Sequence, residues 1–266
     1  MNEPPFKNAS SQEKRAAGTP KFSAAETIAK MRAAGLHNPE VEETLYRAEV
    51  NYNQAYRKYG YRFPPMAMPS EEEKAKMREL VLTGYGNGES FSGLDFTGID
   101  LSGADLRGVD FSEGFLEGAN LEGADLRGAD FTRCVLVRAN LSRAFLPSAK
   151  MSETCLGLAD LSRAELKKAN LSKAVLVEAD LSQAVLSEAN LDEADCTRAV
   201  FNQADMQRAS LKQTQFLESD LTEANLANAK AADAIFVRAV FKDADFSGLD
   251  VEAAIFAGVM GNPAKQ

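Results

Sequence analysis

The residues of this sequence that could do chemistry are mostly carboxylates. Two carboxylates held close together could act as a general acid and base or help to hold a metal ion. Here the acids recur at five-residue intervals, as at Asp100, Asp105 and Asp110. A catalytic pair occurs once, whereas a recurring acid indicates a solvent-facing position that the chain repeats. The sequence therefore predicts no catalytic carboxylate pair, no metal site and no cofactor.

Three cysteines and one histidine are the other candidates. Cys134, Cys155 and Cys196 are separated by 21 and 41 residues, which matches no zinc pattern, and three are too few for a disulfide framework. His37 stands alone beside a predicted helix boundary. Glycines such as Gly103 follow the five-residue interval and form no phosphate-binding loop. No catalytic residue is predicted, and we expect the protein not to be an enzyme.

These residues belong to a repeat of five. Each unit has a large apolar residue, here called its centre, and the centres recur at every fifth position from Phe91 to Phe256. This makes 34 units without an insertion. The centres are Leu, Phe or Met, except Cys196, Ala231 and Val251. An α-helix turns about 500° over five residues, so the centres would spiral around it. In a flat strand they would alternate between faces. If each unit turns a corner, the centre and the residue two before it both point inward.

The repeat resembles the pentapeptide-repeat family, whose consensus is Ala, Asp or Asn, Leu and two variable residues. Units such as ANLEG at 119–123 and ADLSQ at 179–183 carry the resemblance. It implies an all-β solenoid, a right-handed quadrilateral β-helix with four units in each turn. The 34 units then form about 8.5 coils. At about 4.8 Å between strands, the rod would be roughly 40 Å long.

A small α-helical N-terminal region is predicted to precede the solenoid. Ser23 with Glu26 indicates a capped helix start, Asn38 opens a second helix, and Ser70 opens a third, which could cover the first coil. The predicted organisation is a disordered leader (1–22), a helical region with a linker (23–69), an N-terminal capping helix (70–83), the solenoid (84–258) and a tail (259–266).

One face of the predicted solenoid, the apolar stripe, carries apolar residues where the repeat favours polar ones. Random drift would scatter such residues over four faces, and a contiguous exposed apolar patch usually marks a surface that something covers. Either the N-terminal helices cover it, with Val41, Leu45 and the tyrosines as the mating face, or a second chain does. The predicted protein-binding residues of the stripe are Phe115, Val135, Val137, Val175, Val177, Leu217, Ile235, Val237 and Ile255.

The C-terminal end of the solenoid has no predicted helical lid. Unpaired backbone groups and an apolar lumen would face water there. We therefore expect a homodimer in which two chains meet at this end about a two-fold axis, an arrangement that resemblance to gyrase-binding members of the family also implies. The predicted dimer residues are Phe246, Val251, Phe256, Val259 and Met260.

Charge and composition limit the classes of partner that the protein is expected to bind. The formal net charge of −9 argues against direct binding to nucleic acid or to an anionic membrane surface. No stretch approaches the roughly 18 to 20 apolar residues of a membrane span, and the absence of a signal peptide favours a cytoplasmic location. The main hypothesis is a non-enzymatic protein-interaction module or adaptor that uses the apolar stripe.

Two alternatives stay open. Some pentapeptide-repeat proteins mimic duplex DNA and bind DNA gyrase, and the 16 basic and 28 acidic residues from Glu89 to Phe256 fit this, although the bases are interspersed among the acids. The segment 88–96 resembles the opening of repeat regions in type VI secretion accessory proteins, which would make the chain an effector-handling protein. In each case the predicted partner is another protein.

Overall fold

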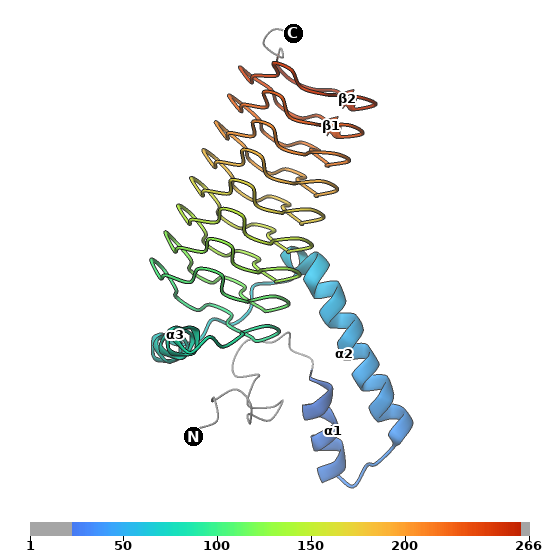
Figure 1. Ribbon diagram of the computed structural model, residues 1–266. Coiled ribbons are helices and arrows are strands. Elements are labelled where there is room, and N and C mark those ends of the chain that lie inside the picture. Colours follow the sequence, from blue (N-terminus) through green and yellow to red (C-terminus); the bar gives the residue numbers. More distant parts are fainter. Residues whose placement is uncertain (1–22, 262–266) are drawn as a thin grey trace.

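The computed structural model describes residues 23–261 (Figure 1). The predicted disordered leader and the last five residues of the predicted tail lie outside this range. The helices and strands, in chain order, are α1 (Ala24–Ala33), α2 (Pro39–Tyr59), the short 3-10 helix η2 (Gly60–Arg62), α3 (Glu71–Gly86), β1 (Ile235–Val237) and β2 (Ile255–Ala257).

The repeat region forms the predicted right-handed quadrilateral β-helix (Figure 1). Parallel bridges join positions twenty residues apart, as from Asn120 to Asn140 and from Asn140 to Asp160. The backbone N–H of Leu121 donates to the carbonyl of Asn140 at 2.7 Å, which ties each coil to the next. Centres such as Leu161 are completely buried in the lumen. The fold implied by the family resemblance is confirmed.

The polar residue before each centre has a role that sequence reasoning missed. Its side chain accepts the backbone N–H of the residue two positions later, as Asp160 does from Ser162 and Asp180 from Ser182, both at 2.8 Å. This local turn needs a short acceptor, which explains the preference for Asp or Asn. These side chains therefore do more than face solvent: they hold the corner that follows them.

Each corner requires a left-handed backbone. The residue two after the centre has a positive φ, which is 63° at Gly103 but also 57° at Arg133 and 58° at Glu178. A residue with a side chain pays roughly 1–2 kcal/mol for this conformation, whereas glycine adopts it freely. Glycine occupies most corners of the first coils, and side chains replace it in most later ones.

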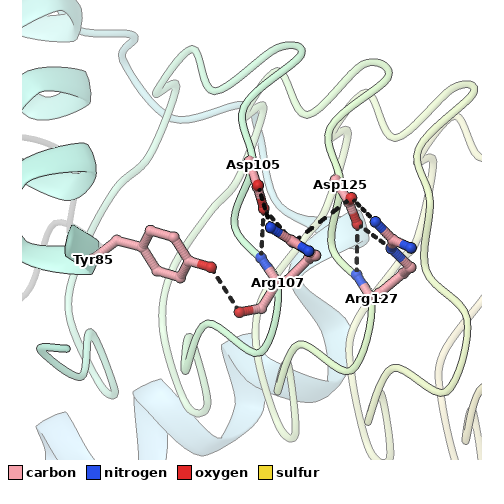
Figure 2. Close-up of polar contacts among 5 residues, drawn as sticks. All are labelled: Tyr85, Asp105, Arg107, Asp125 and Arg127. Atoms are coloured by element: carbon pink, nitrogen blue, oxygen red, sulfur yellow. Dashed lines mark hydrogen bonds and ion pairs between the residues drawn. The ribbon is translucent and has the colours of Figure 1, made fainter.

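Helix α3 closes the N-terminal end of the lumen. Ser70 and Glu73 form the capping box at its start, and the helix continues to Gly86, beyond the predicted end at residue 83. Val81 is fully buried and joins the core of the solenoid. At the end of the helix, the hydroxyl of Tyr85 donates to the backbone carbonyl of Arg107 at 2.9 Å (Figure 2).

Helices α1 and α2 form a hairpin. The side chain of Ser23 caps α1 and that of Asn38 caps α2, as predicted. Near the turn, Arg32 donates to the buried carboxylate of Glu42 at 2.6 Å, which holds the start of α2 against α1. The C-terminal end of α2 lies against the solenoid, and the rest of the hairpin extends away from it (Figure 1).

Candidate protein-interaction surface

The structure divides the apolar stripe into two parts. We call the first the covered half; its residues are buried beneath the end of α2 and the segment that follows, and they are Phe115, Val135, Val137 and Cys155. We call the second the open half; it holds the remaining apolar residues, Val175, Val177, Leu217, Ile235, Val237 and Ile255. Val175 and Val177 lie at the border, and Val177 is still buried.

Aromatic side chains cover the first part. The ring centre of Tyr56 lies 6.5 Å from that of Phe115 and 5.3 Å from that of Phe63, while Tyr52 stacks on Tyr56 at 6.2 Å. Val41, which we expected to join this contact, is 39% exposed and lies outside the covered cluster. Of the mating face expected if the N-terminal helices cover the stripe, Tyr52 and Tyr56 make the contact and Val41 does not, because the start of the helix packs on α1.

Glycines on both surfaces let the covering segment approach closely. A Cβ atom on Gly157 would lie 2.5 Å from the Cβ of Tyr61, and one on Gly118 would lie 2.7 Å from the Cε of Met68. On the covering side, a Cβ on Gly60 would lie 3.1 Å from Val137. Glycine at 157, where neighbouring units carry larger residues, was a signal of this contact that the sequence analysis did not use.

A buried carboxylate, Glu117, fastens the covering segment. It is 1% exposed. Its oxygens accept hydrogen bonds from the guanidinium of Arg138 at 3.0 Å, from the backbone N–H of Met66 at 3.1 Å and from the hydroxyl of Tyr56. Burial and the hydrogen bond to Glu117 raise the pKa of Tyr56, so its hydroxyl keeps the proton that it donates. All three donors satisfy a charge that would otherwise be costly to bury.

A second carboxylate under the same segment is poorly satisfied. Asp95 is 7% exposed, and its Oδ1 accepts the backbone N–H of Thr97 at 2.9 Å. Its Oδ2 is buried and has no hydrogen-bond partner within residues 23–261. Burial raises the pKa of Asp95 to about 6, and the nearby charge of Glu117 adds to the effect. The ionised form of Asp95 therefore destabilises the fold at neutral pH.

Arg57 adds a cationic contact beside Tyr56. Its guanidinium lies 4.7 Å from the centre of the Phe115 ring, and it donates to the backbone carbonyl of Arg133 at 2.8 Å. Cation–π contacts of this kind gain strength when they are partly removed from water. The covered half thus binds an aromatic and a basic side chain that are adjacent on one helix.

The cysteines are buried thiols. Cys134 and Cys196 point into the lumen, and burial raises the pKa of both. Cys155 lies on the stripe beneath Gly60 and Tyr61, and burial raises its pKa to about 11. Reactive cysteines have lowered pKa values and access to solvent. Within the described residues, no group of three or more His, Cys, Asp or Glu side chains could hold a metal ion.

Two surface hollows lie where the open half borders the covering segment, and both are lined by Tyr61, Arg62 and Asp195. One is lined by Tyr59, Val175 and Gln215 among others, and the second by Val177 and Leu217. The structure therefore brings the border valines and the later apolar residues to either side of one carboxylate.

Charged ladders run along both edges of the stripe. On one edge Arg133 pairs with Glu153 at 3.0 Å. On the other edge Arg198 pairs with Glu178 at 3.1 Å and with Glu218 at 3.2 Å. Exposed pairs contribute little stability, typically about 0–1 kcal/mol each. Their effect here is to surround the apolar stripe with a polar rim whose charges largely cancel.

The predicted dimer residues lie together in the last described coils. Val251, Phe256 and Met260 are exposed, and Phe256 is 44% exposed. Its ring stacks on that of Phe236 at 4.8 Å, in continuation of the column of rings in the lumen. Phe246 and Val259 pack partly against the core.

Within residues 23–261, no helix has the length and apolar character needed to cross a membrane. The family model for pentapeptide repeats matches eight copies within this chain, and the matched segments cover more than half of the 266 residues. These segments are 90–123, 116–152, 148–183, 179–216 and 219–258. The sequence matches no curated protein.

Several solved structures resemble this one at a distance. HetL, a pentapeptide repeat protein involved in heterocyst differentiation regulation from the cyanobacterium Nostoc sp. strain PCC 7120, is 25% identical, with coverage of 68% of this chain and 93% of HetL and a TM-score of 0.40. QnrB1, a plasmid-mediated fluoroquinolone resistance protein, is 13% identical, with coverage of 60% and 92% and a TM-score of 0.37. Rfr23 from the cyanobacterium Cyanothece 51142 is 18% identical, with coverage of 63% and 91% and a TM-score of 0.20. These likenesses are too distant to transfer a function.

Proposed function

This chain belongs to the pentapeptide-repeat family, whose members are generally non-enzymatic structural or interaction proteins, and from that premise we propose that it is a non-enzymatic protein-interaction module. Its partner is another protein, which binds the open half of the apolar stripe. The three buried free cysteines fit a reducing compartment, and the proposed location is the cytoplasm.

The division of the stripe is the observation that supports this function. The chain's own N-terminal segment buries Phe115, Val135 and Val137, so these three residues cannot contact a partner while that segment is docked. Within the described residues, nothing of the kind covers Leu217, Ile235 or the later positions. An apolar strip that continues an existing interface, with a polar rim on both sides, is typical of a binding surface.

The test is affinity capture with matched variants. Leu217→Asp combined with Ile235→Asp places two charges in the open half, and the control, Val185→Asp combined with Val200→Asp, places two charges on other faces. We expect a partner captured by the wild type and by the control to be lost with the first variant. A partner retained by both variants, each of them shown to be folded, would contradict the proposed surface.

The gyrase-binding alternative draws on the excess of acidic over basic residues in the solenoid. A DNA mimic needs unpaired negative charge along a stripe, yet Arg107 pairs with Asp105 at 2.8 Å and Arg127 with Asp125 at 2.5 Å (Figure 2). The alternative predicts inhibition of gyrase supercoiling that weakens with salt. The type VI secretion alternative would use the same open half, with a secreted effector as the partner.

We also propose that two copies meet end to end through the last coils. The exposed ring of Phe256 and the side chain of Met260 would be buried in this contact. Light scattering after gel filtration should give a dimer for the wild type and a monomer for Phe256→Asp. A dimer that survives Phe256→Asp but dissociates with Ile235→Asp would place the contact on the open half instead.

A further inference from the structure

We propose that the element of the partner that binds the open half is a helix with aromatic and basic side chains, whose donors bind Asp195. This inference rests on the proposed function and identifies the chemistry of the partner at the same surface. Three features of the molecule support it: the way the covered half binds its own helix, the position of Asp195, and the charges that surround it.

The covered half shows what this face binds when it is occupied. Tyr56 and Arg57 are adjacent on α2, and both approach the stripe. The tyrosine donates to the carboxylate of Glu117, and the arginine lies over Phe115 and donates to a backbone carbonyl at the edge. The apolar residues of the covered half contact aromatic rings, and the carboxylate of Glu117 accepts a hydrogen bond from the helix.

The open half repeats this combination of groups. Asp195 projects from the same face as Glu117, with Val175 and Val177 on the preceding coil and Leu217 on the following one. Its Oδ1 accepts the N–H and the hydroxyl of Thr197, at 3.1 Å and 2.6 Å. Its Oδ2 accepts no hydrogen bond from the described part of the chain. Glu117 uses both oxygens, so Asp195 has one acceptor left for a partner.

Within residues 23–261, Asp195 forms no ion pair, although Arg62 lines the same hollows. Arg198 is shared between Glu178 and Glu218, and Lys173 pairs with Glu193 at 3.6 Å. An acidic partner would bring like charges to Asp195, whereas an Arg, Lys or Tyr side chain could donate to it.

The border with the covered half limits where the partner's cation can lie. Arg62 and Lys58 lie 5.4 Å from the ring centre of Tyr59 and would repel another base there. Arg62 also lines both hollows together with Asp195. The partner's base therefore approaches Asp195 from the side away from Arg62, and the aromatic side chains contact Leu217 and Ile235.

The experiment uses the full chain and two synthetic peptides measured by fluorescence anisotropy. The first has the sequence of residues 46–63 of this protein, which is rich in tyrosine and arginine. The second is identical except that its Arg and Lys residues are replaced by Glu. We expect the first peptide to bind at least tenfold more tightly than the second. Asp195→Asn should weaken the first by about tenfold, because it removes a hydrogen bond to a charged group.

Ile235→Asp should abolish binding of the first peptide, and Val185→Asp on another face should leave it unchanged. Equal binding of both peptides, lost with Ile235→Asp, would overturn the charge assignment and leave the proposed surface intact. Failure of both peptides to bind would overturn this inference, while affinity capture would still decide the proposed function separately.

Cys155 shows which half the peptide occupies. Its thiol lies beneath Gly60 and Tyr61 of the covering segment. Binding at the open half leaves its reaction with a thiol reagent slow. Rapid labelling of Cys155 after the first peptide is added would show that the peptide displaces the chain's own segment, which would contradict the assignment to the open half.

Discussion

The covered and open halves of the stripe share one repeat and one face, but they differ in the residues between their apolar side chains. The covered half holds Gly157, which a larger residue could not replace without displacing Tyr61, and Glu117, whose three donors come from both surfaces. The open half holds Asp195 and Gln215, which remain in contact with solvent. Buried polar groups and close-approach glycines distinguish the covered half from the apolar strip of the open half.

The largest expected effect concerns the lumen, which both halves share. Leu161→Asp would bury an unpaired carboxylate among completely buried side chains and should lower the free energy of unfolding by several kcal/mol, roughly 3 or more. Ser162→Asp, one residue later on the outside, should change it by less than about 0.5 kcal/mol. Urea unfolding measures both. Equal losses would be incompatible with the register of the coils.

The next effect separates the two halves directly. Val135 and Ile235 occupy the same position of the repeat on the same face, but Val135 is completely buried and Ile235 is partly exposed. Val135→Asp should cost about 2–4 kcal/mol, because it places a charge under Tyr56 and Phe63. Ile235→Asp should cost less than about 1 kcal/mol. Similar losses of stability in the two variants would remove the distinction between the halves.

The third effect depends on pH and arises at Asp95. Because burial raises the pKa of Asp95 to about 6, the folded protein binds more protons than the unfolded chain between about pH 4 and 6. The favourable contribution of protonated Asp95 to the stability of the fold is present below about pH 4 and is lost as the pH rises through about 6. Asp95→Asn keeps an acceptor for Thr97 without the charge, so it should raise stability at pH 7, by on the order of 1–3 kcal/mol.

Asp100→Asn is the matched control for this change, at the same repeat position one unit later. The backbone hydrogen bond from Ser102 lowers the pKa of Asp100. Its contribution is therefore present at neutral pH and is lost on acidification. Melting temperatures from pH 3 to 8 should move in opposite directions for the two variants. A gain at pH 7 for both, or for neither, would contradict the account of Asp95.

The smallest effect compares the corners of early and late coils. Gln213 has a φ of 57°, and its replacement by glycine should stabilise the fold by about 1 kcal/mol. Gly103, with a φ of 63°, has open space where a side chain would begin, so Gly103→Gln should destabilise it by a similar amount. Thermal melts would show shifts of opposite sign. Shifts of the same sign would mean that the backbone conformation is not what decides these corners.

The fold could be predicted because every unit obeys the same local rule. Leu161 is buried for the reason that Leu141 and Leu181 are, and one period fixes them all. The capping box of Ser70 and Glu73 is likewise local, since both residues lie within one turn of helix. Such features need no knowledge of what lies far away along the chain.

The covered half could not be placed in the same way. Glu117 is 51 residues from Met66 and 61 from Tyr56, and its burial depends on how the hairpin meets the solenoid. The apolar residues of α2 recur at helical spacing, which suggested that Val41 as well as Tyr56 contacts the solenoid. That spacing could not show that the first part of the helix packs on α1 and the last part on the solenoid. Long-range docking decides which apolar residues of a helix are used.

The division of the stripe is tested most directly by the reaction of cysteines with a thiol reagent under native conditions. The wild-type protein has three buried thiols and should react slowly at all of them, including Cys155 beneath the covering segment. Ile235→Cys introduces a thiol in the open half and should add one site that reacts rapidly. Rapid labelling of Cys155 in the wild type, or protection of the new cysteine in the isolated protein, would contradict the account.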